Sequence, residues 1–244
     1  MIKNKNCLEY LKTLEGESVD LVLTDPPYFI GFDGGKGWDK QWKSEDEYLD
    51  WCKVWTEECA RVLKPERMMV IWGTLKTDTF LRHKLEILNK IPDLYSQNEI
   101  VWSYNWGGRQ KKNFARKHEY AWCYSKDKEF LFNADDVRIE RKVKKNLRTG
   151  KEHTKGTIPT CVWEKNNHTT SKEFCGWHPT TKNIELLERI IKAYTNPGDT
   201  VLDIFMGSGS TMIACNKTGR LGKGCELDEE YYKKSLERII DGTI

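Results

Sequence analysis

The stretch VLDIFMGSGSTMIAC, Val201 to Cys215, constrains the fold of this chain more strongly than any other. It has the pattern of a buried strand that passes through a glycine-rich turn directly into a helix. Glycine lets a backbone approach a ligand closely, and a helix start offers unpaired N–H groups to an anion. Glu226 ends the next expected strand, where a carboxylate can accept hydrogen bonds from ribose hydroxyls. These features predict a nucleoside cofactor bound to an α/β fold.

The rest of the chain alternates strands with helices, which predicts a mostly parallel sheet with helices on both faces. We expect strands at residues 19–24, 67–73, 99–106, 119–125, 200–205 and 220–227. We expect helices at residues 47–63, 74–89, 183–194, 210–218 and 228–240. Residues 133–174 lose this periodicity and become polar and basic, so an insertion is expected there. It divides one catalytic domain into a half at 1–132 and a half at 175–244.

The eight cysteines include no CxxC pair, and the sequence shows neither a secretory signal nor a long apolar span. We therefore expect reduced thiols, a cytoplasmic location and no membrane. Two of the cysteines lie seven residues apart on one helical stripe with large apolar side chains, which indicates core positions. The stripe consists of Tyr48, Cys52, Trp55, Cys59 and Val62.

A second set of residues has the side-chain types that zinc prefers, namely Cys161, His168, Cys175 and His178. Their spacing matches none of the usual structural zinc sites. We therefore expect that the protein needs no metal.

Basic residues are concentrated in two segments, although the net charge of the whole chain is only +3. Residues 109–117 hold five basic residues and no acidic one. Residues 138–155 hold eight basic residues against two acidic ones. A charge run is often only a solvated face, but two runs with aromatic residues nearby are typical of a surface that binds phosphates.

The first expected strand ends in Asp25-Pro26-Pro27-Tyr28. Asp and Pro are common in turns, so a plain turn is one interpretation. A catalytic shelf is the other, because an ionised Asp only accepts hydrogen bonds and Pro offers a carbonyl on a fixed backbone without an N–H.

Three motifs decide between these interpretations: TDPPY at 24–28, HPTTK at 178–182 and DIFMGSGST at 203–211. In this order they resemble the S-adenosylmethionine-dependent amino-methyltransferases of DNA, and the catalytic motif before the cofactor motif resembles their β group. The resemblance covers nearly the whole chain except the insertion. It implies a class I methyltransferase fold, which is Rossmann-like, with permuted motif order and an inserted DNA-recognition segment.

The resemblance also implies where S-adenosylmethionine binds. The loop from Phe205 to Gly209 would hold its methionine part, supported by Asp203, and Glu226 would bind the ribose. Two departures from the family pattern are Asn6, which replaces an acid expected at the adenine, and Thr181, which replaces a usual Gln. Two residues at a helix start, Thr180 and Lys182, would face the cofactor's carboxylate. The full expected set is Asn6, Cys7, Thr180, Lys182, Asp203, Phe205, Gly207, Ser208, Gly209 and Glu226.

The catalytic residues implied by the resemblance are Asp25, Pro26, Pro27 and Tyr28. The Asp25 carboxylate and the Pro26 carbonyl would accept both hydrogens of an exocyclic amine, and Tyr28 would stack on the base extruded from double-stranded DNA. Asp as first residue of the motif favours adenine N6. Two alternatives stay open: methylation of cytosine N4, and a DNA-binding or cofactor-sensing protein that has lost catalysis.

Duplex recognition would fall to the basic segments. One set would contact phosphates without reading sequence: Arg109, Lys111, Lys112, Arg116 and Lys117. The insertion corresponds to the family's target-recognition region, with the candidates Arg138, Arg141, Lys144, Lys145 and Arg148. The glycine-rich loop at 32–42 would close over the extruded base, although Trp42 is equally well explained as a core anchor. The resemblance further raises a homodimer and a separate restriction endonuclease as partners.

Overall fold

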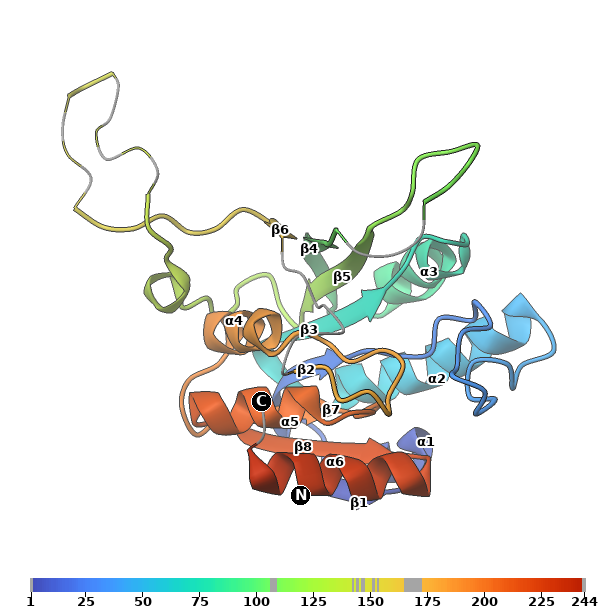
Figure 1. Cartoon of the computed structure of the whole chain (residues 1–244). Helices are drawn as coiled ribbons and strands as arrows, with labels where there is room; N and C mark the ends of the chain where they lie inside the picture. The colour runs from blue at the N-terminus through green and yellow to red at the C-terminus, as the bar shows by residue number, and fades with distance from the viewer. Residues whose placement is uncertain are drawn as a thin grey trace.

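The structure is a computed structural model, and it describes residues 2–105, 109–141, 143, 145, 148–150, 152, 154–164 and 173–242. Within these residues one eight-stranded sheet has the order β1-β8-β7-β2-β3-β5-β4-β6 (Figure 1). Every neighbouring pair is parallel except the two pairs that β5 makes. The expected mostly parallel sheet is confirmed. The strands are β1 (Ile2–Asn4), β2 (Val19–Thr24), β3 (Leu63–Gly73), β4 (Tyr95–Ser103), β5 (His118–Ser125), β6 (Val162–Glu164), β7 (Thr200–Asp203) and β8 (Leu221–Glu226).

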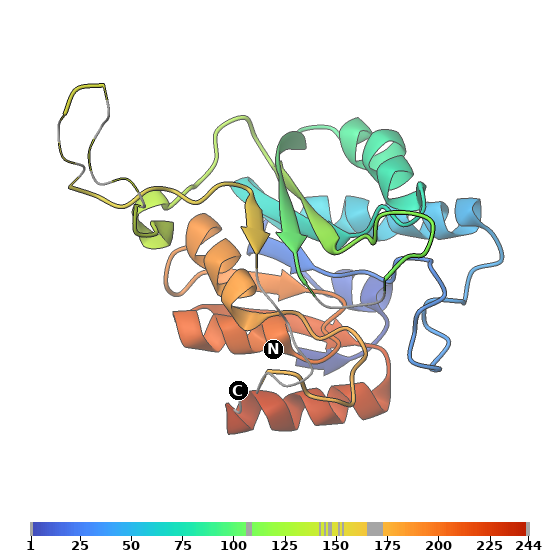
Figure 2. The same cartoon turned by 45° about the horizontal axis from the view of Figure 1, so that its top comes forward.

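Helices cover both faces of this sheet, as Figure 2 shows from a second direction. One apolar core contains Trp55 of α2 and Leu88 of η2, and the other contains Ile190 of α4 and Ile213 of α5. The helical elements are α1 (Cys7–Leu11), α2 (Glu45–Val62), α3 (Thr79–Arg82), the π-helical η1 (His83–Ile87), the 3₁₀ turns η2 (Leu88–Lys90) and η3 (Ala134–Val137), α4 (Ile184–Tyr194), α5 (Ser210–Thr218) and α6 (Glu229–Asp241). None of the helices in the described ranges is long and apolar enough to cross a bilayer.

The expected cysteine stripe of α2 is confirmed, since Tyr48, Cys52, Trp55, Cys59 and Val62 are all buried. The expectation of a continuous helix over 74–89 is wrong. Residues 74–78 are not helical, and the helix that follows changes to π and 3₁₀ geometry. Thr and Asp residues at 74–79 explain this, because their side chains bond locally and compete with helical backbone bonds.

The connections of β2 and β7 leave in opposite directions from the centre of the sheet. β2 leads through α2 to β3 on one side, and β7 leads through α5 to β8 on the other side. Neighbouring parallel strands whose connections diverge form a crevice beyond their carboxyl ends, where ligands bind in open α/β sheets. The residues that follow β2 and β7 therefore border the expected site.

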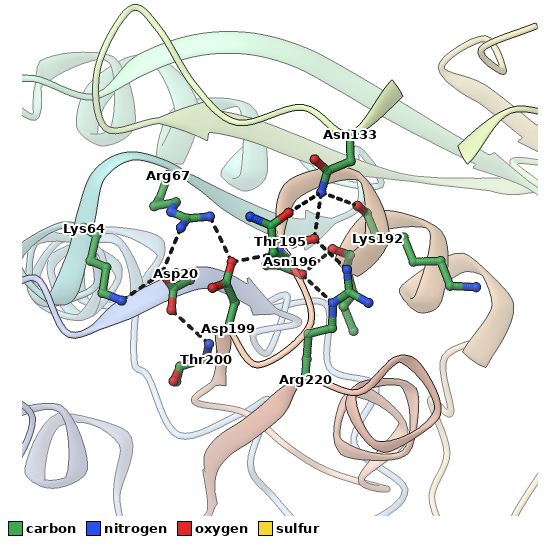
Figure 3. A network of polar contacts seen from close by, with 11 residues as sticks. Asp20, Lys64, Arg67, Asn133, Lys192, Thr195, Asn196, Asp199, Thr200 and Arg220 are labelled. Carbon is green, nitrogen blue, oxygen red and sulfur yellow. Dashed lines mark hydrogen bonds and ion pairs between the residues drawn. The ribbon is translucent and has the colours of Figure 1, made fainter. Parts of the chain in front are cut away.

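A polar network ties the opposite, amino-terminal edge of the sheet together (Figure 3). The Asp20 carboxylate of β2 lies 2.8 Å from Nζ of Lys64 and accepts a 2.9 Å bond from the N–H of Thr200. Arg67 of β3 lies 3.0 Å from the carboxylate of Asp199. These bonds join β2, β3 and β7 on the side of the sheet away from the crevice, so the network serves the fold.

The predicted insertion is anchored in the core at both ends. The side-chain amide of Asn133 donates bonds of 2.8 Å to the carbonyl of Thr195 and 3.1 Å to the carbonyl of Lys192 (Figure 3). Further along, β6 pairs with β4 and buries Trp163. Part of the segment 133–174 thus extends the sheet. The sequence missed this because a three-residue strand shows no clear alternation.

Candidate active site

A cavity of about 900 Å³ opens at the carboxyl ends of the parallel strands. Its size lies within the range of small-molecule and cofactor sites. It is lined by the four predicted catalytic residues Asp25, Pro26, Pro27 and Tyr28, and by nine predicted cofactor residues: Asn6, Cys7, Thr180, Lys182, Asp203, Phe205, Gly207, Ser208 and Glu226. The tenth, Gly209, lies at the N-cap of α5.

Three polar side chains, those of Tyr28, Lys182 and Glu119, gather around the carboxylate of Asp25, which directly follows β2. The Tyr28 hydroxyl donates a 2.5 Å bond to Oδ1 of Asp25, and Nζ of Lys182 lies 2.8 Å from Oδ2. The same ammonium lies 2.8 Å from Oε2 of Glu119 and 3.1 Å from the Tyr28 hydroxyl. Both oxygens of Asp25 therefore have a partner, and Lys182 bridges two acids.

Burial and the neighbouring charges shift the pKa values of the groups in this cluster. Burial raises the pKa of Asp25 above its ordinary value; Lys182 opposes this rise and Glu119 adds to it. Burial lowers the pKa of Lys182, but the two facing carboxylates outweigh burial and raise it above its ordinary value. Burial and the same two acids raise the pKa of Tyr28 well above its usual range. Tyr28 therefore stays a neutral donor and Lys182 stays a cation.

The sequence places Lys182 toward the cofactor's carboxylate, and this role stays a prediction. In the structure its ammonium is paired with Asp25 and Glu119. A buried ammonium needs charged partners, and these two carboxylates satisfy it. Glu119 was absent from the predicted site, because an acid at the start of β5 belongs to no local motif.

The predicted cofactor loop is built on a buried carboxylate at the end of β7. Asp203 accepts hydrogen bonds from the hydroxyls of Thr24 at 2.9 Å and Thr211 at 2.7 Å, and from the N–H of Phe205 at 3.1 Å. Burial raises the pKa of Asp203 to about 6, although these hydrogen bonds oppose the rise. Asp203 thereby fixes the turn that leads from β7 into α5.

The turn approaches His178 and Glu226 so closely that position 207 requires glycine. Gly207 has a φ of 50°, and a Cβ there would lie 2.8 Å from Nε2 of His178. Its N–H donates a 2.8 Å bond to Glu226, whose other oxygen accepts one from Asp228 at 2.9 Å. A carboxylate has about four acceptor positions, so Glu226 retains capacity for two ribose hydroxyls. Asn6, which caps α1 through Leu8, also lines this wall. These residues fit a nucleoside cofactor.

Comparison with known proteins identifies the family, since the N6/N4 DNA methylase model matches residues 19–237. The chain belongs to the DNA methylase family. This family consists of S-adenosylmethionine-dependent DNA amino-methyltransferases, so the cofactor is S-adenosylmethionine.

Three known proteins illustrate the likeness. The DNA adenine methyltransferase YhdJ of Escherichia coli K12 is 36% identical over 247 residues, covering 96% of this chain and 80% of YhdJ. The M1.HpyAVI–SAM complex has a TM-score of 0.64 and 26% identity, covering 98% of both chains. The PvuII cytosine-N4-specific DNA methyltransferase has a TM-score of 0.76 at 20% identity, covering 99% of this chain and 90% of that chain. The last likeness concerns the fold, which is of the class I methyltransferase type.

The loop after Tyr28 in this methylase is held by buried carboxylates. The Asp39 carboxylate accepts hydrogen bonds from three backbone N–H groups of the loop, those of Phe29 at 2.6 Å, Ile30 at 2.8 Å and Phe32 at 3.1 Å. Trp42 packs against Tyr48 and Trp51, with ring centroids 4.9 and 4.7 Å apart. Trp42 therefore anchors the loop to the core, and a closing motion of the loop stays a prediction.

The predicted DNA-binding residues of the methylase divide by location. In the segment 109–117, Arg109 and Arg116 line the cavity, Lys111 and Lys112 are exposed, and Lys117 bonds the carbonyl of Asn105 at 2.9 Å.

The predicted target-recognition residues belong to the other segment, whose described parts extend beside α4 and away from the sheet (Figures 1 and 2). There Arg138 pairs with Asp135, Arg141 bonds the carbonyl of Lys155 at 3.1 Å, and Lys145 lies 3.7 Å from Glu152. Arg148 is exposed but has a polar or charged interaction, and Lys144 lies outside the described residues. Which of these side chains touch DNA stays a prediction.

The zinc candidates of the methylase include His168, which lies outside the described residues. Among the residues that the structure does describe, no three His, Cys, Asp or Glu side chains come together to hold a metal. His178 is instead buried beside Gly207, and burial lowers its pKa to about 4. It is therefore a neutral part of the cofactor wall.

Proposed function

We propose that this DNA methylase transfers a methyl group from S-adenosylmethionine to N6 of adenine at a specific sequence in duplex DNA. The observation that carries this proposal is the carboxylate of Asp25, which lies beside Pro26 at the carboxyl edge of β2 and in one cavity with the cofactor loop. Support for adenine comes from the Asp of the motif and from YhdJ, which is named a DNA adenine methyltransferase.

The chemistry requires a poor nucleophile to be aimed at a good electrophile. When bound, S-adenosylmethionine supplies a methyl group on a positively charged sulfur. The Asp25 carboxylate and the Pro26 carbonyl accept the two amine hydrogens, which directs the nitrogen lone pair at that methyl carbon. As the N–C bond forms and the C–S bond breaks, Asp25 stabilises the positive charge that develops on nitrogen, and the extra proton then leaves toward solvent.

The target amine competes for Asp25 with a partner that is already present. The Tyr28 hydroxyl donates to Oδ1 of Asp25 at 2.5 Å and lies 3.5 Å from Oε2 of Glu119. Binding of the base would transfer this hydroxyl toward Glu119 and leave Oδ1 to the amine. The Tyr28 ring is then available to stack on the base, a contact worth roughly 1–3 kcal/mol.

Methylation of cytosine N4 is the second candidate, because its amine offers the same two hydrogens to the same acceptors. The fold likeness to the PvuII enzyme is compatible with it. A homodimer and a separate restriction endonuclease remain predictions of the family resemblance, and a cytoplasmic location remains a prediction from the cysteine usage.

The deciding experiment incubates the purified protein with methyl-labelled S-adenosylmethionine and unmethylated duplex DNA of mixed sequence, followed by digestion to nucleosides. Label in N6-methyladenine is expected. Label in N4-methylcytosine would select the second candidate. The matched control is Asp25→Ala, which we expect to lose turnover while it still binds the cofactor. A protein that binds cofactor but labels no DNA would support a silent DNA-binding or cofactor-sensing role.

A further inference from the structure

The loop between β4 and β5 rises from the same sheet edge as Asp25. β4 runs parallel to β2 and β3, and β5 runs antiparallel to them, so β4 ends and β5 begins at the carboxyl edge. Figures 1 and 2 show this connection, drawn in green, projecting beyond the sheet. Its described part, residues 109–117, therefore stands above the catalytic cavity.

Among the residues that the structure describes, Phe114 is the most exposed large apolar side chain, with 94% of its surface accessible to water. A single exposed apolar side chain is common on protein surfaces, so the position of Phe114, and not its exposure alone, is what points to a partner. Its surroundings indicate the partner, because five basic residues and no acidic residue share its segment of nine. That charge favours a phosphate backbone.

Phe114 also lines the catalytic cavity, together with Arg109 and Arg116. Asp25 lies inside that cavity, where only 20% of its side chain is exposed. A base in a stacked duplex cannot reach a carboxylate so deeply placed, so the target must leave the helix. Phe114 lines the same cavity but is 94% exposed, so it stands at the rim of the cavity.

We propose that Phe114 inserts into the duplex at the target step and fills the space that the extruded base leaves. This inference rests on the proposed function. The ring stacks between the neighbouring base pairs, as apolar wedges do in proteins that unstack DNA. The flanking arginines and lysines hold the phosphates on either side of that step. Tyr28 holds the base inside the cavity, and Phe114 prevents its return.

A wedge acts on the cost of extrusion, so its removal should matter only when the target base is paired. The test compares two duplexes that carry the target sequence mapped with the wild-type protein. One is fully paired, and the other has an abasic site opposite the target base. Initial rates of label transfer from S-adenosylmethionine are measured at subsaturating DNA for the wild type, Phe114→Ala and Phe114→Leu.

We expect Phe114→Ala to lower kcat/KM on the paired duplex by on the order of tenfold to a hundredfold. On the abasic duplex, kcat/KM of Phe114→Ala should lie within about threefold of the wild-type value. Phe114→Leu, which keeps an apolar wedge, should recover most of the loss. Cofactor binding should be the same for all three proteins.

Two control variants separate the wedge from other effects. Leu85→Ala removes an apolar side chain that is 53% exposed and does not line the cavity, so its rates should match the wild type. Lys112→Ala should weaken binding equally on both duplexes and reduce the salt dependence.

An equal loss for Phe114→Ala on both duplexes, or no loss on the paired one, overturns the wedge while the proposed function stands. A wild-type protein that labels neither duplex overturns the proposed function as well.

Discussion

The ammonium of Lys182 lies 2.8 Å from Oδ2 of Asp25 and 2.8 Å from Oε2 of Glu119, so one cation joins two acids from different strands. Tyr28 is a neutral donor, so the cluster sets one ammonium against two carboxyl groups. Lys182 occupies Oδ2 of Asp25, and the Tyr28 hydroxyl occupies Oδ1. Under the proposed function, the target amine would take Oδ1 once the Tyr28 hydroxyl has turned toward Glu119, 3.5 Å away.

Glu119→Gln should move the pH profile of methyl transfer to lower pH. The pKa of Asp25 is raised by burial and by the charge of Glu119, so activity falls as pH falls through this raised value and the carboxylate gains a proton. Without the charge of Glu119 the pKa of Asp25 drops, and the acid limb of kcat shifts downward. Near neutral pH we expect a loss of about tenfold, because Lys182 then pairs with Asp25 alone.

The profile is measured from single-turnover rates between pH 5 and 9. Glu99→Gln, an exposed acid on β4, is the matched control and should leave the profile unchanged. An acid limb that stays in place in Glu119→Gln would show that Glu119 does not act on Asp25.

Gly207→Ala should weaken cofactor binding and destabilise the fold. The φ of 50° disfavours a side chain, and the new Cβ would lie 2.8 Å from Nε2 of His178. Gly219→Ala provides the matched control, since φ there is 72° but nothing lies within 4 Å of the new Cβ. We expect Gly219→Ala to cost about 1 kcal/mol in unfolding free energy and Gly207→Ala roughly 2–3 kcal/mol.

Denaturant titration gives both costs, and isothermal titration gives cofactor affinity. The double variant Gly207→Ala/His178→Ala should regain part of the stability, because the clash is removed. Equal costs for the two single glycine variants would contradict the close approach.

Asp203 should make the protein less stable as pH rises from about 4 to 6. Its folded pKa is raised to about 6 from 3.8, with burial as the main cause, so the folded state binds its proton more tightly than the unfolded state does. This stabilisation is fully present below pH 4 and is lost by pH 7. Asp203→Asn removes it, so the stability difference between variant and wild type should change by roughly 3 kcal/mol in favour of the variant over that range.

Urea titrations at pH 4 and pH 7 measure this difference. Other carboxylates titrate alike in both proteins and cancel in the comparison. A difference that does not vary with pH would mean that Asp203 ionises normally in the fold.

Asn133→Ala should destabilise the methylase without changing its chemistry. The amide of Asn133 holds the carbonyls of Lys192 and Thr195 at the end of α4 (Figure 3), and Asn133 does not line the cavity. The Thr195 carbonyl also accepts a 2.6 Å bond from Arg220, so its loss is only partial, and the expected cost is about 1 kcal/mol. Thermal unfolding should show the loss, while kcat per folded molecule stays at the wild-type level. Asn98→Ala, whose side chain is exposed, should change neither.

The sequence by itself determined those features of the protein whose residues lie close together along the chain. The alternation of strands and helices indicated the mostly parallel sheet. The turn from β7 into α5 and the acid at the end of β8 indicated the cofactor wall. Asp25-Pro26-Pro27-Tyr28 indicated the catalytic shelf. The motif residues lie in one strand and the turn after it, or in one strand–helix–strand unit, so their spacing along the chain fixes their spacing in space.

Only the tertiary structure decided which side chains meet across the sheet. Asp25, Glu119 and Lys182 come from the end of β2, the start of β5 and the turn before α4. They converge because β5 runs against its neighbours and so begins at the edge where β2 ends. No local pattern records that reversal. The packing of separate strands, rather than any motif, therefore pairs Asp25 with Lys182 and brings Phe114 to the same cavity.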